Sequence, residues 1–231
     1  MSYQSKTALA VSVPARKPLD RVQRTRSNPE TFYGVFGKRL FDIAVVVAII
    51  VPVTLILVVF SLVIALDGKS PVFRQTRVGK GGNEFGMWKL RSMVNDAEAK
   101  LEEYLEANPQ AREEWDSFQK LKNDPRVTPI GKIIRRFSID ELPQVFNVLF
   151  GQMSLVGPRP MLVSQKTRYP GEAYYLLRPG ITGYWQVSER NESEFSARAY
   201  YDTKYCEDLS FGTDIEVMAK TVGCVTGGSG C

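Results

Sequence analysis

Residues 43–66 read IAVVVAIIVPVTLILVVFSLVIAL, a run of 24 residues without a charged side chain. A straight helix of this length would reach about 36 Å, which is enough to cross a hydrocarbon core of about 30 Å. Pro52 interrupts the run after nine residues, where it removes a backbone donor and clashes with the preceding helical turn. The sequence therefore predicts a membrane anchor whose helix is broken at Pro52 into two arms.

Basic residues flank this apolar run on both sides, namely Lys38 and Arg39 before it and Lys69, Arg74, Arg77 and Lys80 after it. A single spanning helix usually carries positive charge mainly on its cytoplasmic side. The symmetric charge, together with two arms too short to cross alone, favours a re-entrant helix that returns to the face it entered. A kinked spanning helix is the alternative.

The net charge of +5 is concentrated at the N-terminus, because residues 1–39 carry +6 and leave −1 for the remaining 192 residues. A basic arm next to an apolar segment favours attraction to anionic membrane lipids. A nucleic-acid-binding protein would carry its basic residues across the folded domain, so nucleic acid is not an expected partner. The alternative for the arm is a merely solvated tail.

Composition divides the chain into four segments. Residues 1–35 are polar, contain prolines and are expected to be a disordered basic arm. Residues 36–70 form the anchor, residues 71–222 the folded domain, and residues 223–231 a flexible tail. We expect the domain to be α/β but mostly helical, with two strands around a glycine-rich turn and helices at about 97–108, 109–122 and 138–150, and a further helix that Thr128 caps. The chain lacks histidine, and its three cysteines form no C-x-x-C pair, which argues against a zinc site or a disulfide framework.

Two adjacent carboxylates, Asp140 and Glu141, lie in the stretch SIDELPQ at residues 138–144. Ser138 and Glu141 have the spacing of a capping box, and an aspartate in the first helical turn complements the helix dipole. The acidic pair is therefore explained equally well as a helix start or as a catalytic pair.

Basic side chains on neighbouring segments favour the catalytic interpretation, and these are Lys89, Arg91, Arg135, Arg136 and Arg159. Carboxylates beside guanidinium groups suit a phosphorylated substrate, and one or two carboxylates plus substrate phosphates typically hold Mg²⁺. Positive neighbours would also keep Asp140 ionised, as a nucleophile requires.

Six ordered motifs follow or flank the apolar run: KRLFD at 38–42, PVFRQTRVG at 71–79, KLRSM at 89–93, SIDELPQ at 138–144, GPRP at 157–160 and RPGITG at 178–183. Together they resemble the bacterial sugar transferase family, the monotopic phosphoglycosyl transferases, over about residues 36–222. The resemblance implies transfer of a sugar 1-phosphate from a UDP-sugar to undecaprenyl phosphate, at the cytoplasmic face of the bacterial inner membrane, at the start of exopolysaccharide or related glycoconjugate synthesis.

The resemblance also implies roles for individual residues. Asp140 matches the nucleophile that forms a covalent aspartyl-phosphosugar intermediate, with Mg²⁺ as cofactor at Asp140, and Glu141 matches its partner. The matching basic positions for phosphate or substrate binding are Lys89, Arg91, Arg135, Arg159 and Arg190. Asp202 and Asp214 fall in a C-terminal pattern of the family, where a solvated or capping role is an equal expectation.

Two other functions remain open at this point: a non-catalytic membrane-surface adaptor and a membrane-tethered phosphohydrolase. Release of a nucleoside monophosphate distinguishes the transferase from the adaptor, and dependence on a lipid acceptor distinguishes it from the phosphohydrolase. The sequence does not identify the sugar, for which galactose and glucose are the candidates, and a homodimer is a further partner that stays open.

Overall fold

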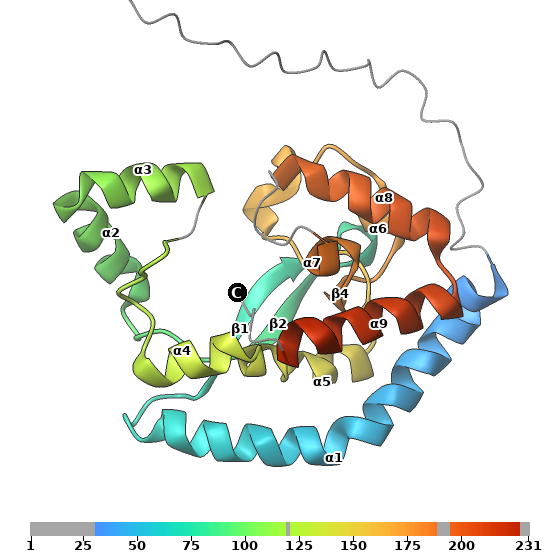
Figure 1. Cartoon of the computed structure of the whole chain (residues 1–231), viewed down its shortest axis with the longest axis horizontal. Coiled ribbons are helices and arrows are strands. Elements are labelled where there is room, and N and C mark those ends of the chain that lie inside the picture. Colours follow the sequence, from blue (N-terminus) through green and yellow to red (C-terminus); the bar gives the residue numbers. More distant parts are fainter. Residues whose placement is uncertain (1–30, 119–120, 189–194, 227–231) are drawn as a thin grey trace, which may run out of the picture.

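The computed structural model describes residues 31–118, 121–188 and 195–226 (Figure 1). This part of the chain is mostly helical and contains two small two-stranded sheets, as expected for the predicted fold class. Residues 1–30, most of the predicted basic arm, lie outside the described residues. The disorder predicted for the rest of the arm is wrong at residues 33–35, because a helical turn, Tyr33–Gly37, leads directly into the first long helix.

Helix α1 (Lys38–Ala65) contains Pro52 and remains one helix along its whole length. It changes direction near its middle and runs along one side of the domain (Figure 1). A bend is the effect expected of a proline within a helix, although the predicted separation into two arms is not observed. Tyr33–Ala65 is the one helical segment among the described residues that is long and apolar enough to cross a membrane.

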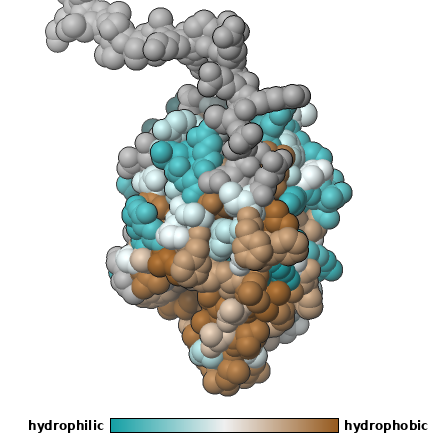
Figure 2. All heavy atoms as spheres, turned by 90° about the vertical axis from the view of Figure 1, so that its right-hand side faces the viewer, coloured by the Kyte–Doolittle hydropathy of each residue, from teal (hydrophilic) through white to brown (hydrophobic). Residues whose placement is uncertain are grey.

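The outer face of α1 is apolar and uncovered. Val47, Val51 and Leu55 are 60%, 67% and 64% exposed, and Leu66 just beyond the helix is 85% exposed. Figure 2 shows apolar atoms gathered at one end of the molecule, on the side where α1 lies, with hydrophilic atoms towards the other end. A contiguous apolar surface of this kind is typical of a membrane or protein contact.

Strands β1 (Val72–Val78) and β2 (Glu84–Leu90) form the predicted hairpin and are antiparallel. In the turn between them, Gly81 and Gly82 have φ angles of 70° and 81°. Glycine adopts positive φ angles without strain, so the backbone of this turn requires glycine at these positions. Helices α2 (Ala97–Ala107) and α3 (Pro109–Phe118) follow close to their predicted positions and project from the domain (Figure 1). Asp96, which precedes α2, makes no side-chain capping bond.

Helix α4 (Pro129–Arg136) begins as predicted, with the Thr128 hydroxyl accepting a hydrogen bond from the Gly131 amide at 2.9 Å. The helix predicted over residues 138–150 is wrong. A 3₁₀ turn, Ile139–Glu141, is followed by a short helix, α5 (Gln144–Leu149), and Ser138 makes no side-chain capping bond. Ser138 has φ 55° and ψ 24°, so the chain turns through the left-handed region instead of entering a helix.

The remaining elements pack behind this turn. They are β3 (Ser154–Val156), α6 (Ala173–Leu176), β4 (Gly180–Thr182), α7 (Tyr184–Ser188), α8 (Arg198–Asp208) and α9 (Phe211–Thr226). Strands β3 and β4 are parallel, and a Cβ atom on Gly180 would lie 2.1 Å from the Gly157 backbone nitrogen. This close approach fixes the GPRP turn at residues 157–160 against RPGITG. The flexible tail predicted from residue 223 is wrong up to Thr226, because α9 continues to that residue.

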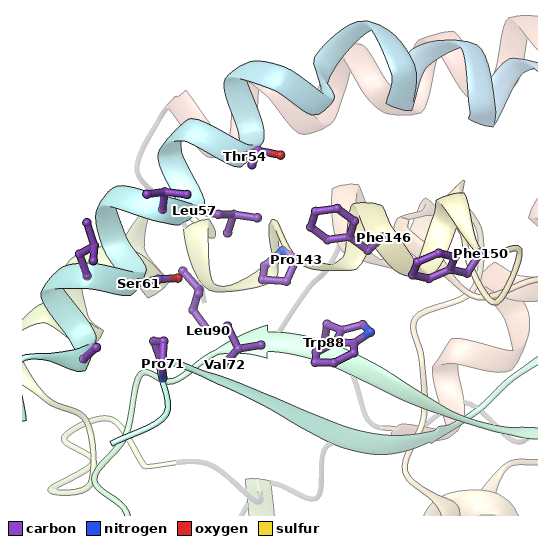
Figure 3. Close-up of a pocket in the computed structure, with 13 residues that line it drawn as sticks. Thr54, Leu57, Ser61, Pro71, Val72, Trp88, Leu90, Pro143, Phe146 and Phe150 are labelled. Atoms are coloured by element: carbon purple, nitrogen blue, oxygen red, sulfur yellow. The ribbon is translucent and has the colours of Figure 1, made fainter. Parts of the chain in front are cut away.

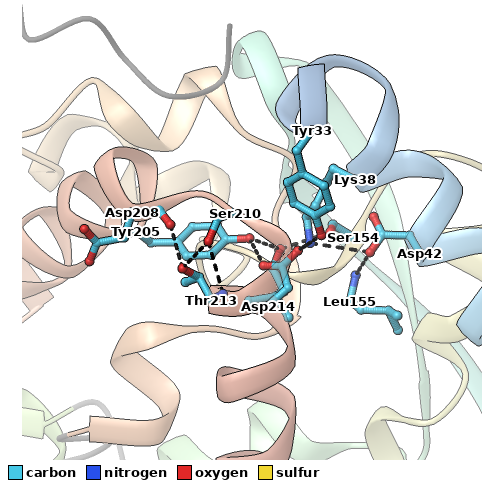
Figure 4. Close-up of polar contacts among 11 residues, drawn as sticks. Tyr33, Lys38, Asp42, Ser154, Leu155, Tyr205, Asp208, Ser210, Thr213 and Asp214 are labelled. Atoms are coloured by element: carbon cyan, nitrogen blue, oxygen red, sulfur yellow. Dashed lines mark hydrogen bonds and ion pairs between the residues drawn. The ribbon is translucent and has the colours of Figure 1, made fainter. Parts of the chain in front are cut away.

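A buried charge cluster joins the start of α1 to α9 (Figure 4). The Lys38 ammonium lies 2.7 Å from Asp214 and 3.5 Å from Asp42. The hydroxyls of Tyr33 and Tyr205 donate to the two oxygens of Asp214 at 2.5 and 2.7 Å. Asp214 is thus neither solvated nor a helix cap, and we name these five residues the anchor cluster.

Candidate active site

The two adjacent carboxylates lie against strand β2. The Lys89 ammonium is 2.9 Å from Oε1 of Glu141 and 3.8 Å from Oδ2 of Asp140. Asp140 is 8% exposed, and the Glu141 side chain is 22% exposed. One lysine therefore contacts both carboxylates, and all three side chains are mostly buried.

The backbone before Asp140 is held in an uncommon conformation. Ser138 is the one non-glycine residue with a positive φ in the described part of the chain. Its amide donates to the Arg135 carbonyl at 3.1 Å, and its own carbonyl accepts from the Glu141 amide at 3.2 Å. A left-handed non-glycine residue costs roughly 1–2 kcal/mol, and such strain gathers at functional sites. Here it places both carboxylates in a turn immediately after α4.

The environments of the two carboxylates separate their pKa values. Burial raises the pKa of Asp140 above its ordinary range, with Lys89 and Arg135 acting against it and Glu141 adding to it. Burial also acts to raise the pKa of Glu141, but Lys89, Arg159 and Arg77 outweigh it and lower that pKa to about 2. Lys89 and Arg135 favour the ionised form of Asp140, as expected, but burial outweighs them in the direction of its pKa. Paired acids with separated pKa values are typical of groups with different catalytic roles.

The structure brings three of the five predicted basic residues to this site. Lys89 contacts both carboxylates, Arg159 Nη2 lies 3.8 Å from Glu141, and the charge of Arg135 opposes the rise in the pKa of Asp140. Arg91 lies elsewhere. It forms a bidentate ion pair with Asp67 at 2.6 and 2.7 Å.

Arg91 therefore holds the chain at the end of α1, where it also donates to the Ser70 carbonyl at 2.9 Å and the Ile64 carbonyl at 3.2 Å. Its hydrogen bond lowers the pKa of Asp67 to about 2. Arg190 lies outside the described residues. Asp202 is buried at 5% exposure and accepts a hydrogen bond from Tyr169 at 2.7 Å, so the solvated or capping role expected for it is wrong.

Sequence reasoning missed two arginines, Arg77 and Arg198. The hairpin register pairs Phe73 with Lys89 and Arg77 with Phe85, so Arg77 and Lys89 share one face of the sheet. That period-two pattern could have identified Arg77 from the sequence. Arg198 approaches from α8, and its guanidinium lies 4.3 Å from the centre of the Trp185 ring.

An apolar groove lies on the opposite face of the hairpin, with a volume of about 540 Å³. Figure 3 shows it between α1, β2 and α5, where its lining includes Leu57, Ser61, Trp88, Pro143 and Phe146. Pro143 lines the groove and comes two residues after Glu141, so the groove passes close to the turn that holds the carboxylates. We call this feature the apolar groove.

The donor set at this site suits Mg²⁺ only in part. The described residues contain no group of three or more His, Cys, Asp or Glu side chains that could hold a metal ion. Glu141 is already paired with Lys89, which leaves Asp140 as the carboxylate best able to bind a cation. A hard cation that takes most of its oxygen ligands from phosphates and water fits this arrangement.

Several known proteins are similar to this chain in sequence. A UDP-galactose-lipid carrier transferase of Erwinia amylovora is 43% identical over 206 residues, which cover 88% of this chain and 43% of that protein. An undecaprenyl-phosphate galactose phosphotransferase of Salmonella typhimurium is 43% identical over 188 residues, covering 80% of this chain and 40% of that protein. The exopolysaccharide production protein ExoY of Rhizobium meliloti is 40% identical over 192 residues, covering 82% and 85%.

The chain thus spans less than half the length of the first two relatives and most of the third. The model of the family described as bacterial sugar transferase matches residues 33–228. This match includes α1, the carboxylate pair and every element that surrounds them. The chain belongs to the bacterial sugar transferase family.

Proposed function

We propose that the protein is a phosphoglycosyl transferase that moves a sugar 1-phosphate from a UDP-sugar to undecaprenyl phosphate. The observation that carries this proposal is the buried Asp140 beside Glu141, with Lys89 bridging the pair and Arg159 behind it. The names of the relatives from Erwinia and Salmonella supply the substrate classes and make galactose the first sugar to test. Glucose, the other candidate from the sequence, is the second.

In the first step, a carboxylate oxygen of Asp140 attacks the phosphorus atom that carries the sugar. A bond forms between this oxygen and phosphorus, the bond from phosphorus to the bridging oxygen breaks, and UMP leaves with that electron pair. In the second step, an oxygen of undecaprenyl phosphate attacks the same phosphorus, and the aspartyl oxygen leaves as a carboxylate. Burial supports this role for Asp140, because a carboxylate deprived of water is more basic and more nucleophilic.

Glu141 acts as a positioning residue. With its pKa at about 2 it is an anion at neutral pH, and it holds Lys89 at 2.9 Å and Arg159 at 3.8 Å. These cations are then in place for the charge that spreads over the transferring phosphoryl oxygens. Mg²⁺ bound through Asp140 and the substrate phosphates would supply further neutralisation of that charge.

The apolar groove supplies a place for the hydrocarbon chain of the lipid acceptor. It lies against α1, whose outer face is apolar, and its lining includes Pro143, two residues after Glu141. A prenyl chain in this groove would bring its phosphate towards Asp140 from the membrane side. The proposal thereby explains why an apolar cavity lies so near a charged site.

The proposed position of the protein is the cytoplasmic face of the inner membrane, with α1 entering and leaving the same leaflet. The bend in α1 supports this arrangement, as do basic residues on both sides of it, since anionic lipids attract them. The cytosolic nucleotide substrate requires the catalytic domain on that face.

The experiment is a radiolabel assay on the full chain with UDP-[sugar-³H] and undecaprenyl phosphate. Wild-type protein should release UMP and yield lipid-linked sugar, and Asp140→Asn should lose both turnover and the labelled covalent adduct. Asp116→Asn, the same change at an exposed position on α3, should behave as wild type.

The outcomes separate the three functions. An adduct that forms normally on Asp140→Asn would disprove the assignment of the nucleophile. Release of free sugar phosphate without lipid would favour the phosphohydrolase, and no UMP release under any condition would favour the adaptor.

A further inference from the structure

We propose that Arg77, Arg159 and Arg198 form an anion site for a phosphate monoester dianion, beyond Glu141 as seen from Asp140. The proposal rests on the proposed function for its biological ligands, which are the released UMP and the phosphate of the incoming lipid. We name these three residues the arginine trio.

The arginine trio converges from three separate parts of the chain. Arg77 is on β1, Arg159 is in the turn after β3, and Arg198 begins α8. The guanidinium groups of Arg159 and Arg198 lie 5.8 and 4.3 Å from the centre of the same Trp185 ring. Arg77 Nη1 donates to the carbonyl of Pro160, the residue after Arg159, at 3.1 Å. The three cations therefore surround one small region.

This region has unused hydrogen-bond donors. The Nε atoms of Arg77 and Arg198 are buried and have no hydrogen-bond partner within the part of the chain that the structure describes. A buried unpaired donor costs about 1–3 kcal/mol, and more when the group is charged. Two such donors in neighbouring guanidinium groups point to a ligand with several acceptor oxygens.

The carboxylates nearby do not balance the positive charge. Glu141 is shared with Lys89, and Asp202, the carboxylate beside Arg198, has a pKa raised to about 7 by burial. Burial, and then the Arg159 charge, lowers the pKa values of both Arg77 and Arg198 to about 10. Buried cations that repel one another are stabilised by a bound anion, and a dianionic phosphate can accept from several guanidinium groups at once.

The order of charged groups determines which phosphate this is. Lys89 joins Asp140 to Glu141, and Glu141 is the neighbour of Arg159 and Arg77, with Arg198 next to both arginines. In phosphoryl transfer the attacking and leaving oxygens are roughly in line on opposite sides of the phosphorus. With Asp140 attacking from one side, the UMP phosphate leaves on the side of the arginine trio. The lipid phosphate must attack from that same side in the second step, so both phosphate monoesters use one site in turn.

The test measures binding to the full chain in detergent micelles, with UMP, uridine and farnesyl phosphate as probes. Wild-type protein should bind UMP at least tenfold more tightly than uridine. Arg198→Gln and Arg77→Gln should each weaken UMP binding at least tenfold without changing the affinity for uridine. Arg168→Gln, an exposed arginine given the same change, should leave UMP binding unaltered.

Unchanged UMP affinity in both trio variants would overturn the proposal. If the melting temperature shows that either glutamine variant is unfolded, the lysine variant at that position replaces it. Lysine keeps the positive charge but lacks Nε and the planar guanidinium. A lysine variant that binds UMP as tightly as wild type would also overturn the proposal. Farnesyl phosphate should displace UMP competitively, and simultaneous binding of the two would disprove the shared site. Because these measurements need no turnover, a transferase assay that fails while the arginine trio binds UMP would reject the proposed function alone.

Discussion

Replacing Lys38 with methionine tests the energetic importance of the anchor cluster. The side chains of Lys38 and Asp214 are 10% and 0% exposed, so the substitution leaves a fully buried carboxylate without its cation. Breaking a buried ion pair costs about 3–5 kcal/mol. Two tyrosine hydroxyls still donate to Asp214, which places the expected loss near the lower limit, at about 3 kcal/mol.

For a domain of this size each kcal/mol lowers the melting temperature by about 2–4 °C, so Lys38→Met should lower it by about 6–12 °C. The measurement is thermal unfolding in detergent micelles, followed by tryptophan fluorescence. Lys100→Met, at an exposed position on α2, is the control and should leave the melting temperature unchanged. Adding Asp214→Asn to Lys38→Met should recover part of the loss, because it removes the uncompensated charge. A Lys38→Met variant that melts with wild type would refute the reasoning.

Four further changes test other parts of the molecule. Pro52→Ala should straighten α1 and move some molecules to a spanning topology. A single cysteine near residue 20, in a background without the three native cysteines, should then become labelled by an impermeant thiol reagent in intact cells. Unchanged protection of that cysteine would contradict this prediction. Ser61→Trp should fill the apolar groove and raise the KM for undecaprenyl phosphate several-fold while leaving that for UDP-sugar unaltered; equal effects on both would argue against the lipid site. Gly131→Ala should destabilise the fold by about 1–3 kcal/mol in chemical denaturation, because its Cβ would lie 2.0 Å from the Ser92 carbonyl oxygen. Burial raises the pKa of Asp202 to about 7. Between about pH 4 and pH 7 the folded chain therefore holds a proton that the unfolded chain has released, so the free energy of unfolding should fall as the pH rises through this range. Asp202→Asn should flatten that slope.

Local sequence signals predicted local structure well. The Thr128 cap, the glycine-rich hairpin turn and the apolar helix each depend on residues close together in the chain, and each is confirmed. The Ser138 capping box failed for the opposite reason. Ser138 and Glu141 have the spacing of a capping box, but Ser138 adopts a left-handed conformation that no local preference of serine would indicate. This turn accompanies the contacts of the carboxylates with Lys89 on β2.

The site itself was only partly predictable. Asp140, Glu141, Lys89 and Arg159 could be proposed from motifs, but Arg198 meets them only because α8 folds back over Trp185 on α7. Arg91 shows the converse, since a basic residue two positions after Lys89 is engaged by Asp67 at the end of α1. Charge type and position in a motif do not specify which partner a side chain finds across the fold.

The anchor cluster also has a consequence for the folding of the chain during its synthesis. Tyr33 and Asp214 are 181 positions apart, so the ribosome releases the membrane helix long before it has made the carboxylate that neutralises Lys38. Of the two carboxylates in the anchor cluster, Lys38 therefore has only Asp42, one helical turn away, until residue 214 has been made, and the contact with α9 forms after that. A chain cut short before Asp214 would lack this contact and leave the Lys38 ammonium with Asp42 as its carboxylate partner in the cluster. The link between α1 and α9 is in this way one of the late contacts of the fold to form.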